Sequence, residues 1–388
     1  MRTEIDSGDP RNKVRWQTRA NEAIAAKLDP SWGQSRLTLI LDVNDRVLTL
    51  LMRMETDDFI QLDQQSDGLR QFVALMAYMA VFSLGSQPII LIDEAETHLH
   101  YDAQADLVRV FEEQREAAKI VYTTHSAGCL PRDLGTGIRA VVPVVEGEGA
   151  DVSKTDDSRI ENHFWTQGRG FSPLLMQMGA SAFAFASTQR AVICEGITDA
   201  LLLPSLIRAA TGAETVRYQF VPGGSEASKT EIPDLDLAGS RVVFLFDGDD
   251  GGSDHGKKTK RGGALSGQVT YLGKKGSGLG VEDLIDAKVY LRAVNDELHV
   301  VRPELTILAR EIPDKGRGTA LDHWCLAQSP KATPLKLSKV AIAQRVLDRR
   351  REQSILASKH TRLVKKLDDE LHELLSKPTP SLGKSTGA

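Results

Sequence analysis

Acidic residues follow two apolar runs of the chain in a pattern typical of metal binding. Glu195 comes directly after AVIC (191–194), and Asp199 lies one helical turn later. Asp247 and Asp249 come directly after VVFLF (242–246). Clustered carboxylates repel each other unless a cation neutralises them, and hard oxygen ligands favour Mg²⁺ or Mn²⁺. The sequence therefore predicts a divalent-metal site, and two ions held there would suit hydrolysis of a phosphodiester.

A second acidic pair follows the apolar run IILI (89–92). Asp93 and Glu94 stand where an ATPase places an acid that holds magnesium through water and an acid that polarises the attacking water. Upstream, Ser66 and Gly68 begin a predicted helix, whose backbone N–H groups could face a γ-phosphate. Downstream, His125 follows a predicted strand. Simple helix capping by Ser66, and a capping or core role for His125, stay open as alternatives.

The elements that must position these residues alternate between strand and helix. The first half predicts a hairpin over 36–55 around Asn44-Asp45, then helices over 67–84 and 103–118 and strands over 89–92 and 119–122. The second half predicts strands over 191–194, 218–221 and 242–246, a helix over 199–210, a Gly/Lys-rich loop over 251–280, and helical structure over 336–377. Buried apolar strands that alternate with helices indicate an α/β fold with parallel sheets.

Composition narrows the class of protein. The 388 residues carry 48 Lys plus Arg against 53 Asp plus Glu, a net charge of −5 that argues against coating nucleic acid by bulk charge. Residues 336–388 are locally basic, so any DNA contact is expected from such patches. No apolar stretch is long enough for a membrane helix. Three separated cysteines argue against a disulfide framework or zinc cluster and favour a cytoplasmic location.

The first half resembles an ABC-type ATPase lobe in the order of its signature helix, Walker B strand, D-loop and switch histidine. The motif Asp-Glu-Ala-Glu-Thr-His-Leu-His (93–100) is similar to the corresponding motif of the OLD (overcoming lysogenisation defect) family. The resemblance implies signature contacts by Ser66 and Gly68, magnesium at Asp93, Glu94 as the base and His125 as the switch.

The chain departs from that family at its phosphate loop. No GxxxxGK[ST] element precedes Ser66, and the look-alike that begins at Gly251 carries Lys where the hydroxyl residue belongs. We therefore expect ATP binding only with a phosphate loop from a missing segment or a partner chain. Otherwise the lobe is a non-hydrolysing scaffold, and the chain alone should have negligible ATPase activity.

The second half resembles the Toprim domain of OLD-family nucleases, with Glu-Gly after one strand and Asp-x-Asp after a later one. By this resemblance Glu195, Asp247 and Asp249 are catalytic and hold metal together with Asp199. Glu282 and Asp283 would serve a second metal, and Lys339 would lie near the scissile phosphate. Alternatives stay open: Asp199 could cap its helix, Glu282 and Asp283 could be first-turn residues that interact favourably with a helix dipole, and Lys339 could be a solvated lysine.

Together these motifs predict a leader (1–35), a partial ABC-type ATPase lobe (36–150), a linker or helical connection (151–187), a Rossmann-like Toprim nuclease domain (188–335) and a basic C-terminal helical segment with a tail (336–388). The resemblance implies a metal-dependent DNA endonuclease with two Mg²⁺ or Mn²⁺ ions, acting as a homo-oligomer in phage defence. Its partners would be DNA and a chain that supplies the phosphate loop or acts as a helicase. The alternative is a non-catalytic scaffold or sensor whose Toprim-like domain binds nucleic acid or a partner protein.

Overall fold

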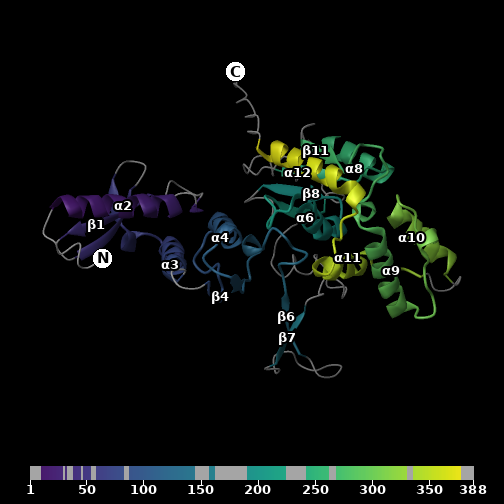
Figure 1. Ribbon diagram of the computed structural model, residues 1–388, viewed down its shortest axis with the longest axis horizontal. Coiled ribbons are helices and arrows are strands. Elements are labelled where there is room, and N and C mark those ends of the chain that lie inside the picture. The colour runs from purple at the N-terminus through teal and green to yellow at the C-terminus, as the bar shows by residue number, and fades with distance from the viewer. Residues whose placement is uncertain are drawn as a thin grey trace, which may run out of the picture. The chain divides into compact units, whose positions relative to one another are not determined.

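The computed structural model describes residues 10–28, 31–32, 38–44, 47–53, 58–82, 87–144, 157–161, 190–223, 242–261, 268–329 and 335–376. The chain forms two compact units, Met1–Leu130 and Pro131–Ala388, which are treated separately below. Figure 1 shows the elements of both units along the chain. No helix within these ranges is long and apolar enough to cross a membrane.

The first unit begins with helix α2 (Pro10–Leu28) and a three-stranded antiparallel sheet of β1 (Thr38–Asn44), β2 (Val47–Arg53) and β3 (Phe59–Gln61). The predicted hairpin is confirmed, since Asn44 pairs with Val47 across its turn. Helix α2 is tied to the sheet by the amide of Asn21, whose Oδ1 accepts a hydrogen bond of 2.7 Å from the backbone N–H of Leu41. Apolar side chains of α2, β1, β2 and the following helix form a small core.

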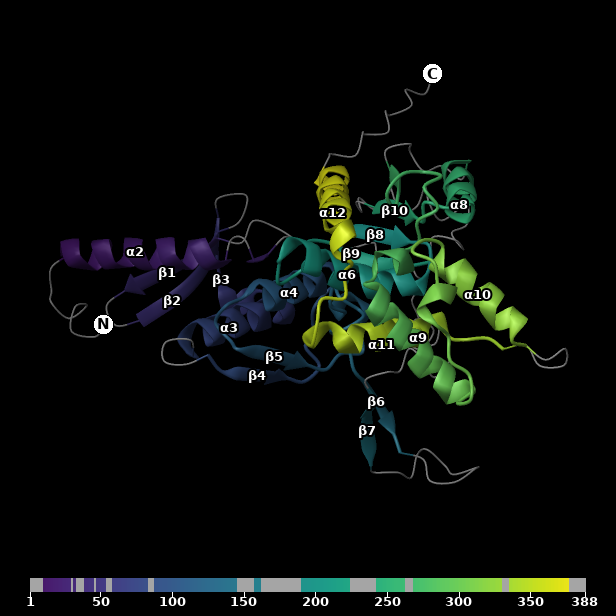
Figure 2. The ribbon, with the colours of Figure 1, turned by 45° about the vertical axis from the view of Figure 1, so that its right-hand side comes forward.

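The remainder of the first unit alternates helix and strand. Helix α3 (Asp67–Phe82), strand β4 (Ile89–Ile92), helix α4 (Tyr101–Glu113) and strand β5 (Lys119–Tyr122) follow each other, and β4 pairs with β5 in parallel. Figure 2 shows the two strands side by side. Their predicted bounds are confirmed, and a core lies between the strands and both helices, formed by Phe72, Met79, Ile90, Leu107, Val110, Phe111 and Ala117. Helix α4 ends before the predicted residue 118 because Gln114 is extended and its side-chain oxygen accepts from the N–H of Ala117.

The second unit is built on a parallel sheet with strand order β11-β10-β8-β9. Strands β8 (Ala191–Cys194), β9 (Gln219–Pro222) and β10 (Val242–Phe246) are buried at every position, as expected for strands covered on both faces. Helix α6 (Ile197–Thr211) connects β8 to β9. Strand β11 (Val269–Tyr271) forms the edge beside β10. The strands predicted over 191–194 and 242–246 have those bounds in the structure, and β9 begins one residue later than predicted.

The prediction of a loop over 251–280 is wrong. Helix α8 (Asp250–Arg261) and strand β11 occupy much of that range. Glycines disfavour helix by propensity, but tertiary packing requires them here. A side chain at Gly252 would place its Cβ 2.2 Å from the carbonyl oxygen of Asp247, and one at Gly256 would meet the Tyr271 hydroxyl at 2.3 Å. These glycines let α8 lie directly against the end of β10 and against β11.

Further helices complete the second unit. They are the 3₁₀ turn η8 (Val281–Leu284), α9 (Ala287–Val301), α10 (Arg317–Ala327), α11 (Lys339–Asp348), the 3₁₀ turn η10 (Arg349–Arg351) and α12 (Thr361–Ser376). A hairpin of β6 (Ala140–Pro143) and β7 (Ser158–Glu161) also belongs to this unit, so part of the segment predicted as a linker pairs in a sheet. Most of that segment, 162–187, lies outside the described residues.

Candidate metal and phosphoryl-transfer site

The acidic residues of the second unit meet where the order of the sheet reverses. From β8 the chain moves outward to β9, and it then returns to place β10 on the other side of β8. Ligands bind to parallel sheets at such a switch point, beyond the carboxyl ends of the strands. Glu195 follows β8 and Asp247 follows β10, and the two are in contact, because Glu195 Oε2 accepts a hydrogen bond of 3.3 Å from the backbone N–H of Asp247. The predicted convergence of these two residues is observed.

Burial and like charge raise the pKa of two carboxyl groups at this point. Desolvation, followed by the charges of Asp199, Glu282, Glu195 and Asp249, raises the pKa of Asp247 to about 10. The pKa of Asp199 is raised to about 7, first by burial and then by Glu282. Both directions mean that the acidic cluster binds a proton more readily than an isolated carboxylate does. A divalent cation could take the place of that proton.

Two members of the cluster also hold the local backbone. Asp199 lies in the first turn of α6, and its Oδ2 accepts from the N–H of Gly196 at 2.9 Å. Asp249 caps α8, since its Oδ1 accepts from the N–H of Gly252 at 2.8 Å. The capping role that the sequence left open for Asp199 is therefore present in the structure. Each of these bonds occupies one carboxylate oxygen and fixes the direction of the other.

Glu282 and Lys339 reach the same place from elements far along the chain. A Cβ on Gly280 would lie 3.4 Å from Asp247 Oδ2 and 3.2 Å from Glu282 Oε2, so both carboxylates approach that glycine. Burial raises the pKa of Glu282, whereas the charge of Lys339 lowers it. Burial lowers the pKa of Lys339, but its 3.0 Å ion pair with Asp322 and the charges of Glu282 and Asp247 together outweigh burial, so the pKa is raised. The ammonium group of Lys339 thus provides a positive charge beside the carboxylates.

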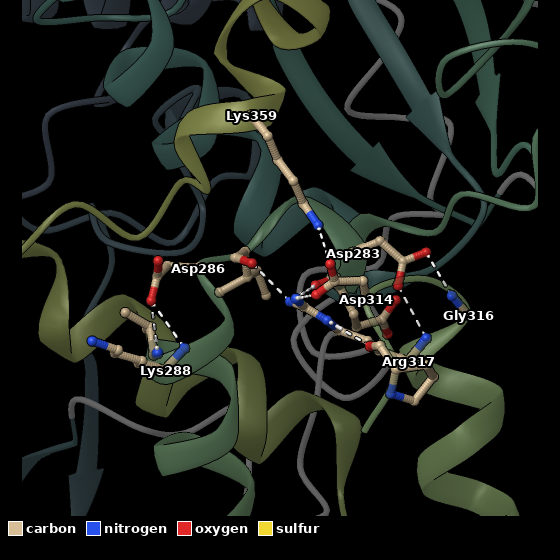
Figure 3. Close-up of polar contacts among 11 residues, drawn as sticks. Asp283, Asp286, Lys288, Asp314, Gly316, Arg317 and Lys359 are labelled. Atoms are coloured by element: carbon tan, nitrogen blue, oxygen red, sulfur yellow. Dashed lines mark hydrogen bonds and ion pairs between the residues drawn. The ribbon is translucent and has the colours of Figure 1, made fainter. Parts of the chain in front are cut away.

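Asp283 is engaged in a different way from its neighbour Glu282. Its Oδ2 accepts from the N–H groups of Gly280 and Gly316, and its Oδ1 accepts from the N–H of Arg317, each at 3.0 Å. The guanidinium of Arg317 is buried, and its Nη1 donates to the carbonyl oxygens of Glu282 and Ile285. Figure 3 shows these contacts around Asp283 and Arg317. Asp283 therefore fixes the turn that carries Glu282, and its oxygens are already used.

The donor set fits a hard divalent cation in its chemistry. Five carboxylates, from the ends of β8 and β10, the first turn of α6 and the turn η8, influence one another electrostatically: Glu195, Asp199, Asp247, Asp249 and Glu282. Within the described residues, however, no three Asp, Glu, His or Cys side chains are arranged as a ready-made metal group. Binding of an ion would therefore require these carboxylates to rotate toward one another.

His255 is a residue of this site that the sequence did not single out. It lies on α8, with its Nε2 3.8 Å from Glu195 Oε1, and its ring stacks on that of Phe246. It was missed because its segment was assigned to a loop. His255 is the sixth residue of α8, and recognising this helix in the sequence would have been needed to bring its ring to Phe246 at the end of β10.

The acidic pair of the first unit lies at the carboxyl ends of its parallel strands. Asp93 and Glu94 directly follow β4, and Thr123 follows its neighbour β5. The Thr123 hydroxyl donates to Asp93 Oδ1 at 2.5 Å and accepts from the N–H of Glu94 at 2.8 Å. Glu94 is in the left-handed region of backbone space (φ 47°), which is rare for a residue other than glycine and clusters at functional sites.

The other predicted residues of the first unit lie around the turn that follows Glu94. A Cβ on Gly68 would be 2.3 Å from the carbonyl oxygen of His98, so the start of α3 touches this turn. Ser66 caps α3 weakly, because its Oγ accepts from the N–H of Leu69 at 3.4 Å. The backbone N–H of His125 donates to Glu96 Oε1 at 2.6 Å. The turn 94–98 thus joins the start of α3 to the segment that carries His125.

Comparison with models of known protein families gave a match that covers most of the first unit. Residues 12–130 match the family described as "AAA domain, putative AbiEii toxin, Type IV TA system", and this match ends at the residue where the first unit ends. The N-terminal unit is therefore an ATPase-like domain of mixed α/β structure.

A search of curated proteins gave no match. A search of solved structures gave a chain described as "Structural biochemistry of ATP-driven dimerization and DNA stimulated activation of SMC ATPases". It is 14% identical to this chain, the alignment covers 38% of this chain and 86% of that chain, and the TM-score is 0.27. At that score the likeness carries no conclusion about this chain.

Proposed function

We propose that the second unit is a Toprim-like nuclease domain that hydrolyses phosphodiester bonds with Mg²⁺ or Mn²⁺. The observation that carries this proposal is the contact between Glu195 and Asp247 at the switch point of the sheet, inside a cluster of carboxylates with raised pKa values. Such a cluster is costly unless protons or cations neutralise it. The resemblance to OLD-family nucleases agrees with the same residues.

Each residue has a defined task in this proposal. Glu195, Asp247 and Asp249 would hold metal at the strand ends, and Asp199 and Glu282 would complete the ligands of two ions. When bound, such ions supply Lewis acidity at the attacking and leaving oxygens of a phosphodiester. Lys339 would offset the negative charge of the scissile phosphate. Asp283 would keep Glu282 in place through its hydrogen bonds to three backbone N–H groups.

Plasmid nicking tests this function. We expect the wild-type chain to nick supercoiled DNA with Mg²⁺ or Mn²⁺ and not in EDTA. The double variant Asp247→Ala with Asp249→Ala should lose nicking. A matched control is Asp254→Asn, because Asp254 is an exposed residue of α8 that pairs with Lys257 outside the carboxylate cluster. Equal nicking by the wild type and the double variant would contradict the proposal.

One observation favours the alternative, a non-catalytic scaffold whose Toprim-like domain binds nucleic acid or a partner protein. Asp199 and Asp249 both form backbone hydrogen bonds that a purely structural role would explain. In that case neither the wild type nor the double variant nicks DNA with either ion, although nucleic acid still binds.

For the ATPase-like domain we propose a coupling role that needs a phosphate loop from elsewhere. The sequence carries no GxxxxGK[ST] element, whereas Asp93 and Glu94 lie at the carboxyl ends of parallel strands, where nucleotides bind. A segment absent from this sequence, another copy of the chain or a helicase-like partner could provide that loop. We place the assembled protein in the cytoplasm, as a homo-oligomer on DNA that acts in phage defence.

A further inference from the structure

A pocket rich in arginine lies at the far end of α11 from Lys339. Its described lining comes from the loop before β6, the last turns of α11 and the turn η10: Gly135, Thr136, Arg139, Gln344, Asp348, Arg350 and Arg351. The space measures about 520 Å³ including its open mouth. Three arginines and one aspartate give this lining a formal charge of +2.

The loop that forms one wall is held firmly in place. Asp133 accepts hydrogen bonds from the N–H groups of Gly135 and Thr136 and from the Thr136 hydroxyl, and it forms a 2.5 Å ion pair with Arg208. A Cβ on Gly135 would lie 2.6 Å from the carbonyl oxygen of Leu201, so this loop sits directly on α6. The wall is preformed, which lowers the entropy that a ligand must lose on binding.

The positive charges of the pocket lie close enough to affect one another. Burial lowers the pKa of the Arg350 guanidinium, an effect that Asp133 opposes and that Arg351, Arg208 and Arg139 reinforce. Arg350 is oriented by donation from its Nη1 to the carbonyl oxygen of Leu347 at 2.9 Å. An anion placed among these guanidinium groups would relieve their mutual repulsion.

An unsatisfied buried amide provides an independent sign of a ligand. Gln344 is only 5% exposed and lines the pocket, and its Oε1 has no hydrogen-bond partner among the described residues. Buried polar atoms are nearly always paired, so an orphan next to a pocket points to a missing group. The unpaired oxygen is an acceptor and does not itself bind an anion, but the oxygen and nitrogen of an amide are interchangeable in assignment, and the flipped side chain presents two N–H donors at that position.

We propose that this pocket binds a phosphate group through its arginines and the Gln344 amide. Guanidinium groups match phosphate oxygens in pairs of parallel hydrogen bonds, and an amide N–H₂ adds a neutral donor. In the proposed nuclease, on which this identification of the ligand rests, the group is a backbone phosphate of the DNA. Helix α11 has ten residues, or about 15 Å at 1.5 Å per residue, between Lys339 and the pocket. That length matches roughly four nucleotides at 3.4 Å each along one strand.

DNA binding in EDTA tests the pocket without any cleavage. The double variant Arg139→Gln with Arg351→Gln changes two exposed side chains, so the fold should be kept. We expect it to bind a short labelled duplex at least roughly tenfold more weakly in fluorescence anisotropy, with the slope of log K against log salt reduced by about 1 to 2. The control Arg310→Gln with Arg362→Gln removes equal charge from exposed positions outside the pocket, and it should leave that slope nearly unchanged.

A second arm distinguishes the source of the phosphate. ATP-induced thermal stabilisation is measured for the same two double variants and the wild type. If the pocket variant loses stabilisation by ATP but binds DNA as the wild type does, the pocket is a phosphate site whose ligand is a nucleotide and not DNA. If the pocket and control variants behave alike toward both DNA and ATP, the inference is overturned. Failure of the proposed nuclease function would be seen separately: the wild type would not nick plasmid DNA, although its pocket would still bind phosphate.

Discussion

Replacing Asp247 by Asn should stabilise the metal-free protein. Burial, and after it the charges of four neighbouring carboxylates, raise the pKa of Asp247 from 3.8 to about 10. A raised pKa means that the folded state holds a proton that the unfolded state has already released. The resulting stability is fully present below pH 3.8 and is lost as pH rises toward 10.

The size of the effect follows from that difference. A pH of 7 lies 3.2 units above 3.8, the pKa of this carboxyl in the unfolded chain, and each unit corresponds to about 1.4 kcal/mol. At pH 7 the free energy of unfolding is therefore lower by up to about 4 kcal/mol than it is below pH 3.8. Asn has nearly the same shape and no charge. The variant should therefore melt on the order of 10 °C higher in EDTA at pH 7, with this gain shrinking as pH falls to 5.

Calorimetry in EDTA, which can separate the transitions of two units, is the assay. Mg²⁺ or Mn²⁺ should then raise the melting temperature of the wild type and have a much smaller effect on Asp247→Asn, because the ion replaces the proton. Asp254→Asn is the control and should give no stabilisation, since Asp254 is exposed and paired with Lys257. A variant that melts at or below the wild type in EDTA at pH 7 would refute the claim that burial and neighbouring charges make the Asp247 carboxylate costly.

Four further outcomes are expected. Changing His255 to Ala should weaken binding of Mn²⁺ more than of Mg²⁺ in calorimetric titration, because imidazole is a better ligand for Mn²⁺; equal losses would place its ring outside the metal shell. Gly68→Ala should destabilise the first unit by about 1 to 3 kcal/mol in thermal melts, because its Cβ would collide with the backbone of His98, and an unchanged melt would show that this contact is not tight. Arg317→Met should cost roughly 2 to 4 kcal/mol in urea unfolding by leaving its carbonyl partners unpaired, whereas a neutral result would argue against the buried network. Phosphate release from ATP by the isolated chain should be negligible, and Glu94→Gln should not alter it; turnover that this variant abolishes would show a complete ATPase.

Strand positions could be predicted well from apolar runs bounded by turn residues, although the buried strand expected over 89–92 has Ile89 and Leu91 exposed in the structure. The apolar runs 89–92 and 242–246 form β4 and β10 with the predicted bounds, and the acids after them lie where parallel sheets bind ligands. Contact between Glu195 and Asp247 depends in addition on β10 lying beside β8 in the sheet. Strand order could be anticipated only by analogy with a family.

What the sequence could not provide are contacts between distant segments. Helix α8 was predicted as loop because its glycines oppose helix, and only their close approach to Asp247 and Tyr271 explains them. The role of Asp283 depends on N–H groups of Gly316 and Arg317, more than thirty residues away. The paired acids 282–283 look equivalent in sequence, but in the structure Asp283 accepts hydrogen bonds from three backbone N–H groups, two of them in a distant segment.

Manganese bound to the crystalline protein, located by its anomalous signal, tests the central claim most directly. The account predicts two peaks beyond the ends of β8 and β10, ligated by oxygens of Glu195, Asp247 and Asp249, and loss of both peaks in the Asp247→Ala with Asp249→Ala variant. Crystals soaked in saturating Mn²⁺ that show no peak there, with the carboxylates still in their metal-free positions, would contradict it.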